Sequence, residues 1–341
     1  MAPKVFLTGA TGYIGGDALY ILQKTHPEWS YSLLVRSKEK LDTLAKAYPD
    51  MRILLGDLDE IDLLRDEAAR ADIVIHAADA DHEAAAKAIA EGLARHSEDN
   101  PGYWIHVSGT GILTTEDFVA ERYGEASDKV FDDWENVDEL TSLPDNAFHR
   151  NVDKVVLAIG ERNTKTVKTA IVCPPTIYGA GRGAISRRSM QVPDLAKAMF
   201  MAGKAPVLGN GKTLWNNVHV TDLSNIFLSL AEAAAAGTED PQIWGAKGYF
   251  LAENGEHIWG DVAELLAREA AARGYLSAAE TKKMSKDEIL DLVGFVSLTW
   301  GLNSRGTSKR ARKVLGWNPT GKTLEEEIPA LVELEWKHFK P

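Results

Sequence analysis

The sequence contains a single cysteine, Cys173, among its 341 residues. An intrachain disulfide is therefore excluded, and a reducing compartment fits this cysteine content best. Long apolar runs are also missing, since no segment approaches the roughly 18 apolar residues that a bilayer-spanning helix needs. The chain enters an apolar strand almost at once, so we expect no signal peptide. The single cysteine, the lack of long apolar runs and the expected lack of a signal peptide together predict a cytoplasmic protein with no membrane partner.

Positive charge is scarce as well. The 38 Lys and Arg residues are outnumbered by 50 Asp and Glu residues, which gives a formal net charge of −12. An acidic protein repels the nucleic-acid backbone, and we therefore expect no nucleic-acid partner. Hydrophobic residues make up 45% of the chain, which is enough to form a full globular core.

Short apolar segments alternate with helical patterns along the first half of the chain. Strands are predicted at residues 4–9, 31–36, 52–57, 72–78, 103–109 and 166–175. Continuous apolar strands separated by helices are typical of a parallel sheet with helices on both faces. We predict an α/β fold, namely a Rossmann-type doubly wound parallel sheet with a smaller C-terminal substrate-binding lobe.

The alternation of strands and helices breaks after Tyr178, which indicates a domain boundary. We assign residues 1–178 to an NADP-binding Rossmann domain and expect residues 216–236 to return to it. Residues 179–341 are expected to form mainly the substrate-binding lobe, including a strand at 248–253.

The first predicted strand is followed by "TGATGYIGG", in which Gly9, Gly12 and Gly15 are evenly spaced. Such glycines allow a tight turn, a close approach of backbone N–H groups to a pyrophosphate, and close helix–strand contact. The helix that begins here presents the positive end of its dipole to the phosphates. Placed between a strand and a helix, this motif predicts a dinucleotide-binding site.

The end of the second strand distinguishes NADP from NAD. A carboxylate there would bind the ribose hydroxyls of NAD, but this strand ends with Arg36, followed by Ser37. A guanidinium at this point suits the 2′-phosphate of NADP, with Ser37 as a further donor. The alternative interpretation is a surface arginine. We predict NADP as the cofactor.

Other cofactor contacts are expected where the later strands end. Asp57 and Leu58 are placed to meet the adenine, and the small Ala77 and Ala78 allow the backbone to approach the cofactor. The remaining expected cofactor contacts are Thr11, Tyr13, Ile14, Ser108, Pro174 and Ile177.

Seven motifs occur in order along the chain: "TGATGYIGG", "GDL" (56–58), "HAA" (76–78), "HVSGTG" (106–111), "PPTIYGAG" (174–181), "NNVHVTDL" (216–223) and "ARKVLGWNP" (311–319). With them the chain resembles the extended short-chain dehydrogenase/reductase family, which includes NAD-dependent epimerases and dehydratases and dihydroflavonol-type reductases. The resemblance covers nearly the whole chain and implies a seven-stranded Rossmann domain. It also implies a homodimer, because family members often dimerise through helices that include the one bearing Lys154.

The family's chemistry uses a Ser or Thr after the fifth strand and a Tyr-x-x-x-Lys motif on the following helix, predicted here over 148–162. The resemblance places the catalytic hydroxyl at Thr110, with Ser108 as the alternative, and the ribose-binding lysine at Lys154. The tyrosine position is occupied by Arg150. Arginine stays protonated in proteins, so it cannot act as a general acid–base at neutral pH.

Three side chains are candidates to replace the tyrosine in proton transfer. His149 titrates in the right range, and Asp153, four residues later, is placed to orient it. Tyr123 lies in a long segment that we expect to fold over the site, and Tyr178 belongs to a turn where its ordinary role is packing. The loss of proton transfer altogether is the remaining alternative.

Two charged segments allow more than one interpretation. Acids in "DADHEAA" (79–85) favour a helix start with Asp81 as its N-cap, and we expect no metal site there. The arginines of "GRGAISRRS" (181–189) either grip an anionic substrate or form a solvated loop. Trp215 is either a wall of the substrate pocket or a core residue.

These observations favour an NADP(H)-dependent oxidoreductase that acts on a small-molecule carbonyl or alcohol substrate. A non-catalytic NADP(H)-binding regulator, similar to NmrA-like proteins, is the alternative that the missing tyrosine motivates. A sugar-nucleotide epimerase or dehydratase is the third hypothesis.

Overall fold

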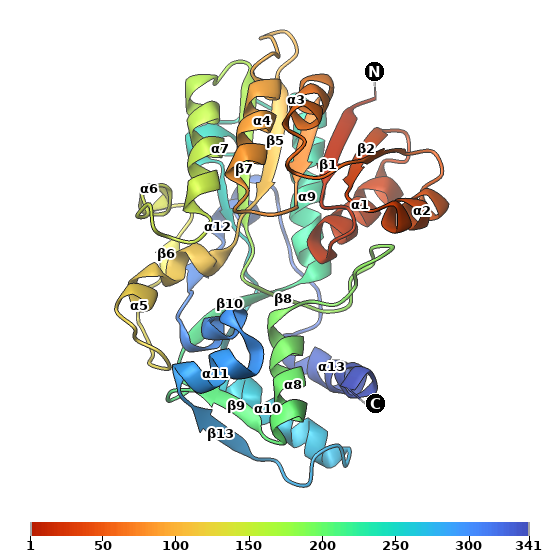
Figure 1. Ribbon diagram of the computed structural model, residues 1–341. Helices are drawn as coiled ribbons and strands as arrows, with labels where there is room; N and C mark the ends of the chain where they lie inside the picture. Colours follow the sequence, from red (N-terminus) through yellow and green to blue (C-terminus); the bar gives the residue numbers. More distant parts are fainter. Residues whose placement is uncertain (1, 340–341) are drawn as a thin grey trace.

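A seven-stranded parallel sheet forms the larger lobe, with the strand order β11-β7-β5-β4-β1-β2-β3. The computed structural model describes residues 2–339 (Figure 1). The strands of this sheet are β1 (Lys4–Thr8), β2 (Ser30–Val35), β3 (Arg52–Leu55), β4 (Ile73–His76), β5 (Gly102–Val107), β7 (Val167–Cys173) and β11 (Tyr249–Leu251).

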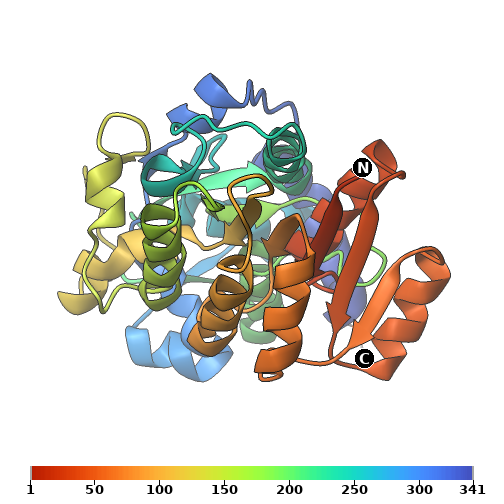
Figure 2. The same ribbon diagram turned by 90° about the horizontal axis from the view of Figure 1, so that it is seen from above.

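Successive residues of a strand point to opposite faces of the sheet, and both faces are apolar here. Helices therefore cover both faces. In β1, Val5 and Leu7 belong to one core and Phe6 to the other. The first core lies beneath α1 (Tyr13–Thr25), α2 (Lys38–Ala47) and α9 (Val220–Ala235). The second lies beneath α3 (Ile61–Arg70), α4 (Glu83–Leu93) and α7 (Arg150–Arg162), which run side by side in Figure 2. The predicted doubly wound Rossmann fold is confirmed.

Two segments from late in the chain complete the larger lobe. Helix α9 packs against α1, and β11 pairs with β7, with Tyr249 opposite Ile171. We expected the strand at 248–253 in the smaller lobe, but the structure places it at the edge of the main sheet. Its Tyr249, Phe250 and Leu251 are all buried, which suits an edge strand covered on both faces.

The smaller lobe begins at β8 (Thr176–Tyr178) and lies below the sheet in Figure 1. Its core includes Trp215, Trp259 and Trp300. The elements of this lobe are β8 (Thr176–Tyr178), α8 (Gln191–Ala202), β9 (Ala205–Leu208), β10 (Leu214–His219), β12 (Glu256–Ile258), α10 (Trp259–Ala272), β13 (Thr281–Met284), α11 (Lys286–Val293), η3 (Phe295–Gly301) and α13 (Leu324–Phe339).

The remaining elements of the described chain are short. They are η1 (Thr110–Thr114), α5 (Thr115–Val119), β6 (Phe131–Asp132), α6 (Val137–Thr141), η2 (Gly245–Lys247), β14 (Gly306–Thr307) and α12 (Lys309–Val314). Within the described part of the chain, every helix is too short or too polar to span a lipid bilayer.

Candidate active site

A cleft of about 630 Å³, here called the outer cleft, lies at the carboxyl ends of β1 to β4. Ligands bind at this edge in doubly wound sheets. The predicted cofactor residues that line it are Gly9, Thr11, Gly12, Arg36, Asp57, Leu58, Ala77 and Ala78. It is also lined by residues that we did not predict as cofactor contacts, among them Lys40, Asp59, Asp79, His82 and Ser186.

The turn after β1 lines the outer cleft through Gly9, Thr11 and Gly12. Gly9 has a φ of +84°, and a Cβ atom there would lie 2.2 Å from the carbonyl oxygen of Ala77. Helix α1 begins at Tyr13, and its N-cap, Gly12, offers no side-chain cap to the first turn. Uncapped N–H groups and the positive end of the helix dipole both attract a phosphate. The turn therefore fits the pyrophosphate of a dinucleotide.

Arg36 directly follows β2 and lines the outer cleft together with Lys40. Two cations that line the same cleft suit a phosphate monoester such as the 2′-phosphate of NADP. Ser37 and Gly15, which we also predicted as cofactor contacts, are not among the residues that line the outer cleft, and each makes a local backbone contact beside it. The Ser37 hydroxyl caps α2 by accepting from the Lys40 N–H at 3.3 Å, and a Cβ on Gly15 would lie 2.4 Å from the Gly9 carbonyl oxygen.

A second cavity, of about 410 Å³ and here called the inner cavity, adjoins the outer cleft at Ala77, which lines both. The predicted site residues that line it are Tyr13, Ile14, Ser108, Thr110, His149, Pro174 and Ile177. Trp215 also lines it and is only 2% exposed, so it is a pocket wall and a core residue at once. The Thr110 hydroxyl is buried without a hydrogen-bond partner among residues 2–339, so it is available to bind a ligand oxygen.

His149 contacts Asp81 and lines the inner cavity at the same time. Its Nδ1 atom lies 3.0 Å from Oδ1 of Asp81, and its backbone N–H donates to the same oxygen at 3.1 Å. On the other side of the ring, Nε2 would lie 3.2 Å from a Cβ atom built on Gly109. The carboxylate orients the imidazole, and the hydrogen bond from His149 lowers the pKa of Asp81.

The backbone of His149 is in the left-handed region, with a φ of 63°. Such a conformation costs a residue other than glycine roughly 1–2 kcal/mol, and it is concentrated at functional sites. His149 is the N-cap of α7, so the helix begins at Arg150 and not at 148 as the apolar pattern predicted. This start sets which side chains of α7 face the site.

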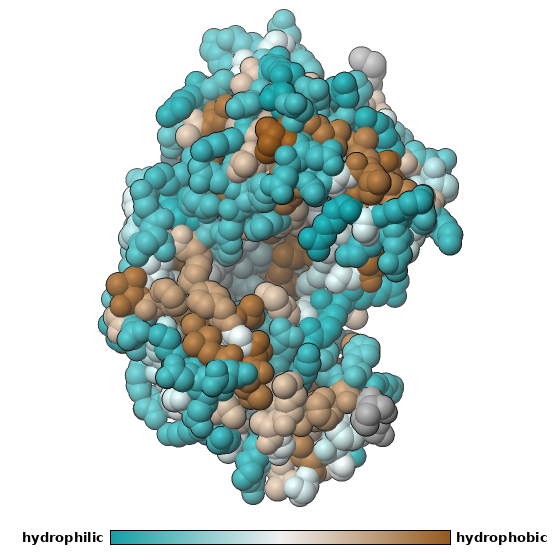
Figure 3. Space-filling model, in the orientation of Figure 1, coloured by the Kyte–Doolittle hydropathy of each residue, from teal (hydrophilic) through white to brown (hydrophobic). Residues whose placement is uncertain are grey.

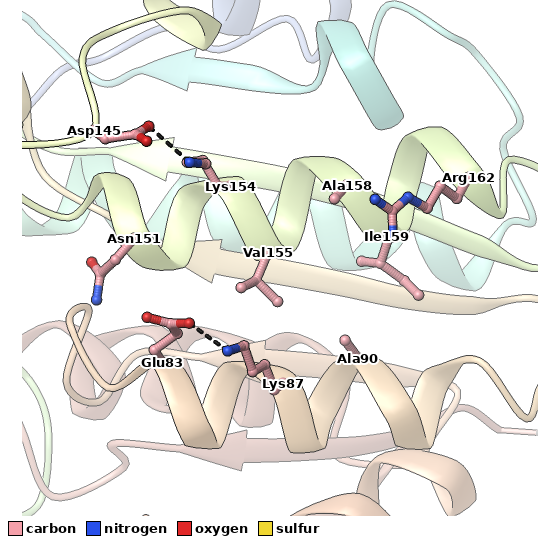
Figure 4. A pocket seen from close by; sticks show the side chains of 10 residues that line it. All are labelled: Glu83, Lys87, Ala90, Asp145, Asn151, Lys154, Val155, Ala158, Ile159 and Arg162. Atoms are coloured by element: carbon pink, nitrogen blue, oxygen red, sulfur yellow. Dashed lines mark hydrogen bonds and ion pairs between the residues drawn. The ribbon is translucent and has the colours of Figure 1, made fainter.

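Arg150 and Lys154 both project away from the inner cavity. The buried Arg150 guanidinium donates to the carbonyl oxygens of Leu143 and Thr141 at 2.9 and 2.6 Å. The Lys154 ammonium lies 2.8 Å from Oδ1 of Asp145, over a hollow between α4 and α7 (Figure 4). The structure therefore does not bring Lys154 to the predicted ribose position, and Arg150 holds the loop before α7.

The two tyrosine candidates for proton transfer have other surroundings. Tyr123 packs against the core of the smaller lobe, where the Lys286 ammonium lies 5.3 Å from its ring centre. The Tyr178 hydroxyl donates to the carbonyl oxygen of Lys322 at 2.8 Å. Both contacts are structural, and neither tyrosine reaches His149.

Asp153 is fully buried behind the inner cavity and does not orient His149. Its Oδ2 atom accepts from the Tyr249 hydroxyl at 2.8 Å, and its Oδ1 atom lies 3.8 Å from Nε2 of His106. Burial raises the pKa of Asp153 to about 6 and lowers the pKa of His106. The interaction with Ser108, which lines the cavity, partly opposes the rise for Asp153. The buried Asp153 carboxyl group therefore lies behind the wall of the inner cavity that carries the Ser108 hydroxyl.

Oxidase ucsJ of an Acremonium species is 39% identical to the chain over 341 residues, which cover 98% of each protein. The chain belongs to the ucsJ family. A more distant relative, uncharacterized protein C2A9.02 of Schizosaccharomyces pombe, is 26% identical and covers 95% of this chain and 98% of its own. No protein-family model matches the sequence.

Solved structures similar to this ucsJ-family chain include enzymes of the epimerase/dehydratase type, as the sequence resemblance implied. The dTDP-glucose 4,6-dehydratase of Bacillus anthracis, solved with NAD, matches with a TM-score of 0.68 at 13% identity, covering 99% of this chain and 100% of the other. The UDP-glucuronic acid 4-epimerase of Bacillus cereus, solved with UDP-glucuronic acid and NAD, gives 0.64 at 15% identity and 98% coverage of both chains. At such identities these similarities show the fold.

Asp81 is the site residue of this ucsJ-family chain whose role the sequence did not reveal. We predicted it as the N-cap of α4, but that place belongs to His82, whose Nδ1 atom accepts from the Ala85 N–H at 3.1 Å. Asp81 instead reaches α7. Its position just after β4 could have indicated that Asp81 lies at the site, because the segments that follow parallel strands meet at one edge of the sheet.

Proposed function

We propose that the protein is an NADP(H)-dependent oxidoreductase of the extended or atypical short-chain reductase type, acting on a carbonyl or alcohol of a small molecule. The observation that carries this proposal is the paired His149, which lines the inner cavity while Asp81 engages its Nδ1 atom. The ucsJ relative is named an oxidase, which supports a redox reaction.

Each polar group of the inner cavity has a role in this proposal. The Thr110 hydroxyl, buried and without a partner in the described chain, binds the substrate oxygen. His149 donates a proton to that oxygen in reduction and accepts it in oxidation, while Asp81 holds the ring and balances its charge. A nicotinamide cofactor, when bound, supplies or accepts the hydride.

The choice of NADP over NAD rests on Arg36 and Lys40, which both line the outer cleft. A carboxylate at the position of Arg36 would favour the unphosphorylated ribose of NAD. The glycine turn and the uncapped start of α1 support dinucleotide binding in either case.

Purified protein tests the proposal through NADPH consumption with a panel of aldehydes and ketones, beside the His149→Asn variant. Asparagine tolerates the left-handed backbone but does not titrate between pH 5 and 8. We expect turnover to fall about 10²- to 10⁴-fold in the variant, with NADPH affinity unchanged. NADPH binding without turnover on any substrate would instead favour the non-catalytic regulator.

A second candidate function, sugar-nucleotide epimerisation or dehydration, is favoured by the names of the structural neighbours. It predicts that NAD stays bound through purification and that UDP- or dTDP-sugars are converted without net consumption of cofactor. Release of NADP from the denatured protein, identified by mass spectrometry, would count against it.

A further inference from the structure

We infer that the substrate is an uncharged molecule with an apolar, aromatic body and a single reacting oxygen, and not a nucleotide-linked sugar. This inference rests on the proposed oxidoreductase function and specifies its substrate class. Away from the polar groups near His149, the walls of the inner cavity are formed largely by Ile14, Pro174, Pro175, Ile177, Met190 and Trp215.

Arg188 is the one Lys or Arg side chain among the described residues that line the inner cavity, and its three guanidinium nitrogens are already engaged. Its Nε atom lies 2.7 Å from Oε1 of Glu335, and Nη2 lies 3.0 Å from Oε2 of Glu335 and 2.8 Å from Oδ1 of Asp194. Nη1 donates to the Ser189 carbonyl oxygen at 3.2 Å. A guanidinium held by two carboxylates does not compensate the charge of a diphosphate.

The other arginines of the 181–189 loop are also engaged inside the protein. Arg182 is paired with the buried Asp17, its Nε atom lying 3.1 Å from Oδ2. Arg187 donates from Nε to the Gly183 carbonyl oxygen at 3.0 Å. These contacts hold Arg182 and Arg187 against the protein, and neither side chain lines the inner cavity. A phosphorylated substrate would lose its water in the inner cavity without gaining an unpaired cation.

Three phenylalanines, here called the aromatic ridge, lie beside the inner cavity. Phe118, Phe148 and Phe295 contact one another edge to face, with ring centres 5.3 to 6.2 Å apart. They come from α5, from the residue before His149, and from η3, respectively. A Cβ atom built on Gly111, which lines the inner cavity, would lie 4.0 Å from the Cβ atom of Phe148. Thr299 of η3 also lines the cavity, so the ridge lies beside it.

The aromatic ridge is partly open to solvent. Phe295 is 58% exposed, and Met190, which lines the inner cavity, is 55% exposed. Figure 3 shows apolar surface gathered beside the central hollow, over the region of α5 and α11. Exposed apolar surface next to a cavity marks a ligand-binding site more often than a solvated face. An apolar substrate would cover it while its oxygen reaches Thr110 and His149.

Calorimetry on the NADP⁺-loaded protein tests the substrate class without turnover, since a ketone cannot be reduced by the oxidised cofactor. The two probes are 2-acetylnaphthalene and UDP-glucose, each titrated with and without NADP⁺. We expect the ketone to bind and UDP-glucose to bind at least about a hundredfold more weakly, because its phosphates would be buried uncompensated. Tighter binding of UDP-glucose, or no binding of the ketone, overturns the inference.

The Phe295→Ser variant tests the role of the aromatic ridge. Because the Phe295 side chain is exposed, we expect this variant to fold normally. We expect the ketone to bind about threefold to tenfold more weakly, because an aromatic contact is lost. Met201→Ser, which changes another exposed apolar residue (51%) on α8, is the matched control and should leave affinity unchanged. Equal affinity of Phe295→Ser and the native protein also overturns the inference. Ketone binding with no NADPH-dependent reduction would contradict only the proposed oxidoreductase function.

Discussion

The Nδ1 atom of His149 lies 3.0 Å from Oδ1 of Asp81, and 68 positions of sequence separate the two residues. The pair joins the segment after β4 to the start of α7. Its geometry therefore depends on the packing of α4 against α7. Because Asp81 engages Nδ1, Nε2 is the ring nitrogen that faces the backbone of Gly109 at the inner cavity.

Replacing Asp81 with Asn should lower kcat with little change in NADPH affinity. The amide keeps an oxygen that can accept from Nδ1 but loses the charge that balances a protonated imidazole, so we expect a loss of about tenfold. Steady-state kinetics and calorimetry measure the two quantities. Asp145→Asn, which removes the exposed partner of Lys154, is the control. An equal loss of kcat in both variants would contradict a specific role for Asp81.

Replacing Arg36 with Asp should change the cofactor preference from NADPH toward NADH. The lost charge-assisted hydrogen bonds predict NADPH binding weaker by about tenfold to a hundredfold, and the new carboxylate favours a free ribose. Fluorescence titration with both cofactors gives the ratio of affinities. Lys38→Asp changes the same charge on an exposed side chain nearby, and it should leave the ratio unchanged. A shift of the same size in both variants would show a general effect of charge.

Alanine at Gly9 should abolish dinucleotide binding and destabilise the fold. Its Cβ atom would lie 2.2 Å from the Ala77 carbonyl oxygen, and its φ of +84° is unfavourable for a side chain. Gly203, with a φ of +69° and open space within 4 Å of the point where a Cβ atom would lie, is the matched control. Gly203→Ala should cost only about 1 kcal/mol of stability and leave binding intact. Thermal melts with and without NADP⁺ separate the two effects.

Asp153 should make the protein less stable as the pH rises from about 4 to about 6. Burial raises its folded-state pKa to about 6, above the value of about 3.9 for an unfolded aspartate. The folded state therefore binds more protons in this window, and the free energy of unfolding falls as the pH increases. In Asp153→Asn this decline should be reduced by an amount on the order of 2–3 kcal/mol. Parallel pH dependences of urea unfolding in the two proteins would contradict it.

Local patterns were sufficient to predict most of the larger lobe. The strands and the glycine turn are set by neighbouring residues, through apolar runs and through the spacing of Gly9, Gly12 and Gly15. Their predicted positions agree with the structure because each signal lies within about ten residues of the chain.

The inner cavity and the His149–Asp81 pair depend on contacts that local patterns do not contain. His149 has a left-handed backbone at the N-cap of α7, which begins at Arg150, and Lys154 on this helix lies beside Asp145. Asp81, which stabilises that backbone through the His149 N–H, is far away in the sequence. A periodic pattern gives the period of a helix but not its rotation about its axis, so it does not predict that Lys154 lies beside Asp145 and outside the lining of the inner cavity.

The late position of β11 in the sequence determines when the sheet can be completed during translation. Its partner β7 ends at Cys173, but the strand that completes the sheet beside it begins only at Tyr249. Until residues 249–251 have been translated, β7 is an open edge whose backbone groups can pair with another nascent chain. A premature stop within residues 179–248 would therefore release a Rossmann sheet that is prone to aggregate, although its whole glycine turn has already been synthesised.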